Sequence, residues 1–527
     1  MKSVRGVKSI ASFAPLAALW VFAACSGDTG PSPRALADPP PSAGIYKVNH
    51  IIIVMMENHS FDNYFGALAY APESPYHASS AGCAAADHRC VDGLSCSIDA
   101  AGELACTNSN DEDDGTRVAV FHEPTRCVRP DLAHSWVQSH LEANFNDPSG
   151  TLIASPNDGF VRVNDTAEQP ANGLETATED QTMGYYTQDD LPFYYDLAQK
   201  FAIDDRYFSS VLGPTLPNRM YLMAASSFGH VTTGDSAPVG GFQPITGTIF
   251  DLLDDRAVSW ADYSQSGGQA GLFRQPHAPG TDAHFPTLQT FLAQARGQRG
   301  AGNLPAVSLV DPTFGGPEED DEHPPTDIQR GQAFVSMIVN AVRDGPDWKD
   351  SVIFITWDEH GGFYDHAMPP PASQGGSQTP DGIFPGQCAD LSNPPASERP
   401  GGGAGCASID DAESLCPALA DDPTGPYPAN CAGFDHFGFR VPFLVVSPFA
   451  RPHYVAHATG DHTSLLAFIE RRFLSESAGE ERPHLTGRDQ HADDLEDLFD
   501  FDDAPSRYTP VGQAQGPLTD CTPDSGQ

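Results

Sequence analysis

Basic side chains are scarce in this sequence. Its 527 residues include 28 Lys and Arg against 71 Asp and Glu, which gives a formal net charge of -43. Broad binding to nucleic acid or to an anionic membrane needs a basic face, so we expect no nucleic acid partner. The charge instead predicts an acidic, solvated surface. A local positive site made by a metal ion or by histidine is compatible with this surface and could accept a phosphate group.

Hydrophobic and aromatic residues are also fewer than in an average compact domain, at 39% and 9%. The 49 Gly and 47 Pro residues indicate many loops around an ordinary core, and we find no internal repeat. We therefore expect a globular protein with long surface excursions.

The N-terminus has the pattern of an export signal over residues 1–25. Lys2, Arg5 and Lys8 precede an apolar stretch that is too short and too early for a dependable membrane span. Small residues before Cys25 resemble a bacterial lipoprotein processing site, after which lipid on Cys25 would tether the chain to a membrane. Ordinary secretion stays open, because Phe22 is unusual at its position. The predicted location is the outer membrane or cell surface as a lipoprotein, or a secreted or periplasmic form. Residues 26–44 are predicted to form a flexible tether.

The cysteine spacings fit no zinc motif. Apart from Cys25, ten cysteines form two groups: Cys83, Cys90, Cys96, Cys106 and Cys127, then Cys388, Cys406, Cys416, Cys431 and Cys521. An even number in an exported chain predicts disulfides, whose pairing the sequence leaves open. The loop-like segments 67–130 and 370–435 contain most of these cysteines, so we interpret them as disulfide-stapled insertions.

Short apolar runs alternate with helical patterns. The runs "HIIIVMM", "LPAVSLV", "SVIFITW" and "VPFLVVS" lack polar alternation, which suits strands buried on both faces of a parallel sheet. Segments such as "DIQRGQAFVSMIVNAVRDG" and "HTSLLAFIERRFL" place apolar residues at three- and four-residue intervals. The alternation predicts an α/β fold with a mostly parallel central sheet flanked by helices.

Polar residues follow several of these runs directly. Glu57 and Asn58 end the first run, and Asp358 and Glu359 end the run at Trp357. Ligands of such sheets bind beyond the carboxyl ends of the strands, so these four side chains are candidates for one site. Thr215 precedes a helical run and is a candidate for a hydroxyl among free N–H groups at a helix N-terminus, or for a simple helix cap.

Six segments, in order, carry a resemblance to a known family. They are "HIIIVMMENHSFDNYFG", "HSW", "FSSVLGPTLPNR", "EDDEHPPTDIQRGQAFV", "TWDEHGGFYDH" and "GDHTSLLAFIERRF". Together they resemble the bacterial phosphoesterase family of phospholipases C and acid phosphatases. The likeness covers residues 46 to 502 and implies an alkaline-phosphatase-like core, with a catalytic domain at 45–503 and a C-terminal tail at 504–527.

The resemblance implies a metal-dependent active site. Glu57, Asn58, Asp358 and Glu359 would bind one divalent ion together with the hydroxyl of Thr215. Oxygen ligands suit a hard ion such as Mg, Mn or Ca, whereas Zn or Fe stay open. Coordination would activate Thr215 as a nucleophile that forms a phosphothreonine.

Histidines are the predicted proton donors and phosphate contacts. By motif position we expect His323 as acid or base and His134 as a phosphate contact. Weaker candidates for orienting the ligands are His360, Asp365, His366 and His462. Asn218 and Arg219 lie one turn into the helix after Thr215 and are candidates for phosphate contacts, but we expect them instead to fix the loop by hydrogen bonds to the backbone.

The predicted substrate is a phospholipid or a small phosphoester. Thr at the nucleophile position and "MGYYTQDDLPFYYDLA" resemble the phospholipase branch more than the phosphatase branch. We therefore expect cleavage of a phosphatidylcholine-type lipid into diacylglycerol and a phosphorylated head group. Two alternatives are an acid phosphatase acting on monoesters and, less favoured, an inactive surface-binding lipoprotein.

Overall fold

A computed structural model of the chain describes most of residues 44–521. The residues left out of the description inside this range are 80–81, 101, 113–114, 130, 145–156, 165–180, 239, 266, 274–282, 373–379, 381, 387–414, 416–431, 476–481, 504, 507–508 and 513–520. The predicted export signal, nearly all of the tether, Cys25, four cysteines of the second group and most of the tail therefore lie outside the described residues.

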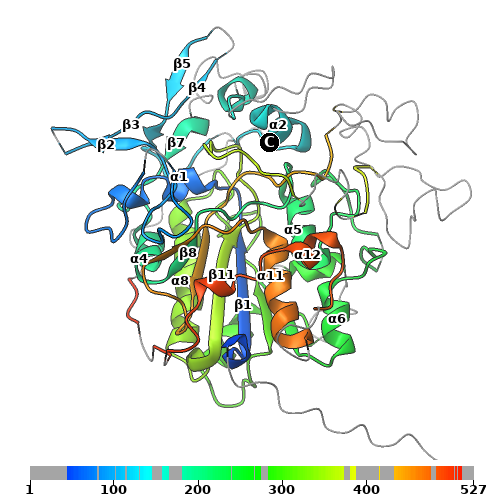
Figure 1. Cartoon of the computed structure of the whole chain (residues 1–527). Helices are drawn as coiled ribbons and strands as arrows, with labels where there is room; N and C mark the ends of the chain where they lie inside the picture. Colours follow the sequence, from blue (N-terminus) through cyan, green and yellow to red (C-terminus); the bar gives the residue numbers. More distant parts are fainter. Residues whose placement is uncertain are drawn as a thin grey trace, which may run out of the picture. The chain divides into compact units, whose positions relative to one another are not determined.

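A seven-stranded mixed sheet forms the centre of the described chain (Figure 1). In spatial order its strands are β13 (Tyr454–Ala456), β8 (Ala202–Asp204), β12 (Phe443–Val446), β11 (Ser351–Trp357), β1 (His50–Met56), β10 (Val307–Val310) and β9 (Trp260–Tyr263). All residues of β10, β11 and β12 are buried, as the unbroken apolar runs predict.

Helices cover both faces of the sheet, which confirms the predicted α/β class. Helices α4 (Pro192–Lys200), α7 (Leu288–Ala295) and α8 (Ile328–Arg343) form one layer, whereas α5 (Thr215–Ala224), α6 (Ile249–Asp255), α11 (His462–Ile469) and α12 (Gly487–His491) form the other. Apolar residues of α4, α5, α6, α7, α8 and α11 belong to the hydrophobic core, whereas α12 has no apolar residue. Within the described residues, no helix combines the length and hydropathy needed to cross a membrane.

The sheet is mostly parallel, as predicted, and one of its strands is reversed. Strand β12 is antiparallel to both of its neighbours, β11 and β8. Its carboxyl end therefore lies at the opposite edge of the sheet, where Ser447 donates a hydrogen bond to the carbonyl of Ser351 at the start of β11 (2.9 Å). A strand buried on both faces has the same apolar composition in either direction, so the run of residues did not reveal this reversal.

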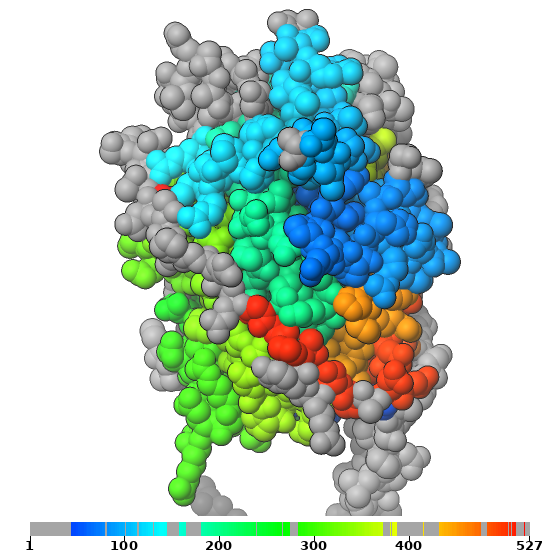
Figure 2. All heavy atoms as spheres, turned by 90° about the vertical axis from the view of Figure 1, so that its left-hand side faces the viewer, coloured from blue at the N-terminus to red at the C-terminus, as the bar shows by residue number. Residues whose placement is uncertain are grey.

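Small elements gather beyond the carboxyl ends of β1 and β11. They are α1 (Phe61–Phe65), β2 (Cys96–Ile98), β3 (Leu104–Cys106), β4 (Ser109–Asp111), β5 (Arg117–Ala119), β6 (Phe121–His122), β7 (Gly184–Tyr185) and α2 (Trp136–Ala143). Figure 2, which views the molecule from the left-hand side of Figure 1, shows the blue and cyan segments of this group in the upper part of the view.

Single helical turns complete the fold. These are the 3₁₀ turns η1 (Gly44–Lys47), η2 (Leu68–Tyr70), η3 (Gln181–Met183), η4 (Gln269–Leu272), η5 (Trp348–Asp350) and η7 (Glu496–Leu498), and the π-helical turn η6 (Glu470–Leu474) that extends α11.

Three disulfides are present in the described part of the chain. Cys83–Cys90 and Cys96–Cys106 close short loops within the first insertion, as predicted. The third, Cys127–Cys521, joins the first cysteine group to the C-terminal tail. Disulfides of this kind are typical of exported proteins.

Candidate active site

Strands β1 and β11 bring the two predicted acidic pairs to one edge of the sheet. The strands pair in parallel with Met56 opposite Trp357, so the residues that follow each strand are neighbours. The backbone N–H of Asn58 donates to Asp358 Oδ1 (3.3 Å), and the N–H of Asp358 donates to the carbonyl of Met56 (3.1 Å). Asn58, Asp358 and Glu359 are completely buried, and Glu57 is 7% exposed.

A glycine turn fixes the loop after Glu359. Gly361 has φ +64°, and a Cβ at this position would lie 2.3 Å from the carbonyl oxygen of Asn58. The N–H of Gly361 donates to Glu359 Oε2 (2.7 Å). The glycine in "DEHGG" is therefore required both by the left-handed conformation and by the close approach of the two loops.

Thr215 begins α5 at the same edge of the sheet. Pro214 is the N-cap, and Thr215 is partly buried. Asn218 fixes the preceding loop, since its side chain accepts from Val211 N–H (3.0 Å) and donates to the carbonyl of Gly213 (2.9 Å). The N–H of Leu216 donates to Thr233 Oγ1 (3.2 Å), so this helix end offers fewer free N–H groups than the sequence suggested.

Arg219 does not fix the loop, contrary to the prediction. Its guanidinium lies between two of the proposed ligands, 3.0 Å from Glu57 Oε1 and 2.8 Å from Asp358 Oδ2, and it also donates to the carbonyl of Met56 (3.0 Å). Burial raises the pKa of Asp358 to about 7 although Arg219 opposes the shift. Arg219 is one helical turn after Thr215, and that spacing was the available signal that both face the same site.

A cavity of about 760 Å³ opens beside these groups. Glu57, Thr215 and Arg219 lie on its wall together with apolar side chains, among them Phe314. The proposed nucleophile and one proposed ligand therefore face the same space.

Two histidines predicted to contact phosphate stand near Glu359. His134 Nε2 lies 3.8 Å from Glu359 Oε1, and Asp131 lies between His134 and His323, at 3.8 Å and 3.7 Å. Burial alone lowers the pKa of His134, but Glu359 and Asp131 raise it to about 9. The pKa of His323 is also raised, by Asp131 and Glu57 against the effect of burial.

His360 is held between two buried carboxylates. Its Nε2 lies 2.7 Å from Glu142 Oε2, and its Nδ1 lies 3.2 Å from Glu359 Oε2. Burial lowers the pKa of His360, but Glu142 and Glu359 raise it to about 9. Sequence reasoning missed Glu142, which lies in α2 without a motif of its own.

The remaining weak candidates have different surroundings. His462 Nε2 lies 2.7 Å from the carbonyl oxygen of Asp358, and burial lowers the pKa of His462 to about 4. Asp365 and His366 instead contact Arg440, at 2.9 Å and 3.2 Å, and His366 pairs with Asp62 at 2.6 Å. This buried cluster lies behind α1, and its positive centre is the guanidinium of Arg440.

The donors at the sheet edge fit a hard metal ion. Asn58 Oδ1 and Glu359 Oε1 are buried and have no hydrogen-bond partner among the described residues. Unpartnered buried oxygens are costly, and a cation would satisfy them. Carboxylate, amide and hydroxyl oxygens are the ligand types that Mg, Mn and Ca take, so the donor set suits such an ion.

Apart from the sheet-edge donors, four groups of three titratable side chains in the described chain place their ligand atoms within 4.8 Å of one another. They are Asp131, His134 and His323; Asp62, Asp365 and His366; His50, Asp347 and Asp350; and His77, Asp87 and Cys90. Glu57, Asp358 and Glu359 do not form such a group. The first group lies beside Glu359 and is a second candidate binding site for an ion.

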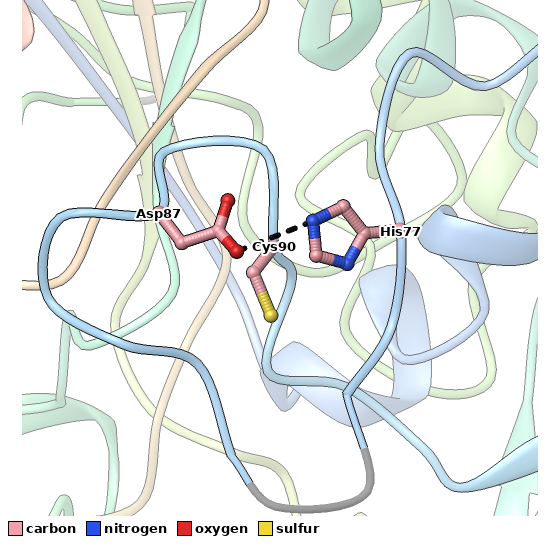
Figure 3. A group of neighbouring side chains, drawn as sticks. All are labelled: His77, Asp87 and Cys90. Carbon is pink, nitrogen blue, oxygen red and sulfur yellow. Dashed lines mark ion pairs between the residues drawn. The ribbon is translucent and has the colours of Figure 1, made fainter.

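The group in Figure 3 offers no thiolate. His77 pairs with Asp87 at 3.3 Å, as the dashed line shows, but the sulfur of Cys90 is bonded to Cys83. A disulfide sulfur is a poor ligand because metal binding by cysteine needs the thiolate.

Comparison with known proteins decides the family. The profile of the Phosphoesterase family matches residues 48–474. The chain belongs to the phosphoesterase family. This phosphoesterase is thus a hydrolase of phosphoric esters, as predicted.

Its relatives are named phospholipases C. Phospholipase C A and phospholipase C B of Mycobacterium tuberculosis are each 29% identical, over 91% of this chain and 81% of theirs. Non-specific phospholipase C4 of Arabidopsis thaliana is 28% identical over 82% of this chain and 69% of its own. Among solved structures, murine ectonucleotide pyrophosphatase/phosphodiesterase 5 covers 59% of this chain and 94% of its own at 11% identity, with a TM-score of 0.29. That structural likeness is too small to support an argument.

Proposed function

We propose that this phosphoesterase is a metal-dependent phospholipase C that acts through a phosphothreonine on Thr215. One observation carries the proposal: Glu57, Thr215 and Arg219 line the same cavity at the sheet edge where Asn58, Asp358 and Glu359 are buried. The names of the relatives favour a phospholipid as the substrate.

Glu57, Asn58, Asp358, Glu359 and Thr215 would hold the ion. A bound divalent ion supplies charge neutralisation at the phosphate and lowers the pKa of a coordinated hydroxyl. Arg219 keeps the carboxylates of Glu57 and Asp358 apart from solvent and fixes their orientation.

In the first step, Thr215 Oγ1 releases its proton to solvent and forms a bond to phosphorus, while the bond from phosphorus to the diacylglycerol oxygen breaks in line with the attack. The leaving oxygen takes a proton from His323, whose pKa Asp131 and Glu57 raise against the effect of burial. In the second step, water gives a proton to His323 and attacks phosphorus, and the bond to Thr215 Oγ1 breaks. The phosphorylated head group is released, and Thr215 regains its proton from solvent. His134, charged near neutral pH, contacts a phosphate oxygen.

The direct test compares phosphatidylcholine with a phosphomonoester across pH, on purified protein without residues 1–25. We expect diacylglycerol and phosphocholine as products and little monoester turnover. Preference for the monoester at acid pH would instead make the protein an acid phosphatase. No turnover of either substrate with any of Mg, Mn, Ca, Zn or Fe would favour the inactive surface-binding alternative.

A nucleophile variant tests the chemistry. Thr215→Ala should lower kcat by at least about 10³-fold, because covalent catalysis requires the hydroxyl. Thr215→Ser, which retains a hydroxyl, is the matched control and should keep measurable activity. Substantial hydrolysis by Thr215→Ala would exclude the phosphothreonine.

Export is part of the same proposal. Disulfides in the described chain suit an oxidising compartment. Lipid on Cys25 would add a membrane tether and is tested by mass spectrometry of the mature protein.

A further inference from the structure

We propose that the cavity beside Thr215 binds the positively charged ammonium end of the head-group alcohol. Asp235 makes the site select a head group with this charge. This inference rests on the proposed phosphodiester hydrolysis and adds the subsite that determines head-group preference. No sequence motif had singled out Asp235.

Asp235 is within reach of the reacting groups. It lines the same cavity as Thr215, Glu57 and Arg219. Thr233, two residues earlier, accepts a hydrogen bond from the N–H of Leu216 (3.2 Å), so the loop carrying Asp235 is attached to the first turn of α5. The cavity volume of about 760 Å³ is enough for a phosphate and a further organic group.

The carboxylate of Asp235 lacks full compensation. Its side chain is only 3% exposed, and Oδ2 lies 2.5 Å from His230 Nδ1. The other oxygen, Oδ1, is buried and has no hydrogen-bond partner among the described residues. An acyl chain beside this side chain would leave the carboxylate without further compensation, whereas the positive charge of an ammonium group in the cavity would offset its charge through space, without contact to the buried Oδ1.

Aromatic rings on the wall favour the same kind of ligand. Phe285 and Phe314 both line the cavity, and the guanidinium of Arg219 lies 4.9 Å from the centre of the Phe314 ring. A cation is thus already accommodated at one aromatic face of this cavity. Quaternary ammonium groups are bound by such faces together with a carboxylate.

The charge of the lining is also suitable. Among the described lining residues, Glu57 and Asp235 are acidic, and Arg219 is the cationic side chain. Arg219 is already paired with Glu57 and Asp358, so it does not neutralise Asp235. A cationic group of the ligand would neutralise Asp235.

Two chromogenic diesters with the same leaving group test the subsite. One is p-nitrophenyl phosphorylcholine, and the other is p-nitrophenyl 3,3-dimethylbutyl phosphate, in which carbon replaces the quaternary nitrogen. Because size and leaving group match, the ratio of their kcat/KM values reports the charge alone. We expect the wild type, assayed with a divalent metal, to prefer the choline ester by about tenfold or more.

Asp235→Asn should reduce this preference to about twofold, through a higher KM for the choline ester. Asp111→Asn is the matched control, since Asp111 lies on β4 in an exposed pair with Arg117 and not on the cavity wall. It should keep the wild-type preference.

Equal hydrolysis of both esters by the wild type, or an unchanged preference in Asp235→Asn, would overturn the inference. If Asp235→Asn loses activity toward both esters, Phe314→Leu replaces it, and an undiminished preference in that variant overturns the inference as well. If the wild type cleaves neither ester nor any other phosphodiester, the proposed function itself fails.

Discussion

Arg219 shows how a single side chain organises this site. It is 2% exposed and bonds Glu57 and Asp358, two residues that follow different strands. Sequence reasoning found both carboxylates, because each ends an apolar run, but assigned Arg219 to the loop. A guanidinium reaches several ångströms from its backbone, so its partner depends on tertiary packing that motif spacing does not reveal.

Removing this guanidinium should destabilise the metal-free protein. Arg219→Met leaves two buried carboxylates unpaired, and we expect a loss of about 3–5 kcal/mol in the free energy of unfolding. Denaturant unfolding in EDTA measures this loss in the free energy of unfolding. Arg117→Met is the control, because its pair with Asp111 is exposed and screened by solvent, so its loss should change the free energy of unfolding far less. Equal losses in the two variants would show that the buried Arg219 pairs stabilise the folded protein no more than an exposed pair does.

His366 should make stability depend on pH. Burial lowers the pKa of His366, but Asp62 raises it from the usual 6.5 to about 10. A group with a raised pKa stabilises the folded state fully below pH 6.5, and that contribution disappears as pH rises from about 6.5 to 10.

His366→Gln should therefore remove a loss of up to about 5 kcal/mol that the wild type shows over this pH interval. Unfolding measured at pH 6 and pH 10 tests it. His77→Gln, which alters an exposed pair with Asp87, should leave the wild-type pH dependence in place. A wild-type free energy that stays flat across the interval contradicts the assignment.

At the scale of elements, the strands and helices around the site and the mostly parallel sheet were predictable, but the reversal of β12 was not. The run 328–343 and the run after Thr215 form α8 and α5, as their periodicity indicated. The reversal of β12 and the disulfide between Cys127 and Cys521 depend on contacts between distant segments, which local pattern does not encode. Strand direction matters here, because residues that follow β1, β9, β10 and β11 surround the site, whereas the carboxyl end of β12 lies at the opposite edge of the sheet.

The turn after β11 should tolerate no side chain. Gly361→Ala would place a methyl group 2.3 Å from the carbonyl of Asn58 and would impose a left-handed conformation on alanine. We expect a loss of more than about 2 kcal/mol in stability and a lower kcat, because Asn58 and Glu359 both contact this turn. Thermal unfolding and hydrolysis assays measure the two effects.

Gly300→Ala provides the matched control. Gly300 also has positive φ, at +86°, but no atom of the described chain lies within 4 Å of the point that a Cβ would occupy. The substitution should cost only about 1 kcal/mol and leave kcat unchanged. A similar kcat for Gly361→Ala and Gly300→Ala would mean that close packing against Asn58 has no catalytic importance.

At the scale of the whole molecule, a metal ion would join segments about three hundred residues apart. Glu57 and Asn58 follow β1, Thr215 begins α5, and Asp358 and Glu359 follow β11. A ligand that binds only the folded state stabilises it by about 2.7 kcal/mol at a concentration 100 times its Kd. Chelation should therefore lower the Tm by a few degrees, and refilling should restore it.

Two variants decide which of the two candidate sites binds the ion: the sheet edge, or the group of Asp131, His134 and His323. Glu359→Gln removes a charge from the predicted site, where Oε1 is buried without a hydrogen-bond partner among the described residues. Asp131→Asn removes one from the group with His134 and His323. If the ion lies at the sheet edge, Glu359→Gln abolishes the metal-dependent rise in Tm and Asp131→Asn retains it. The opposite result would place the ion beside the histidines, and Glu359 would then serve to orient His134 and His360.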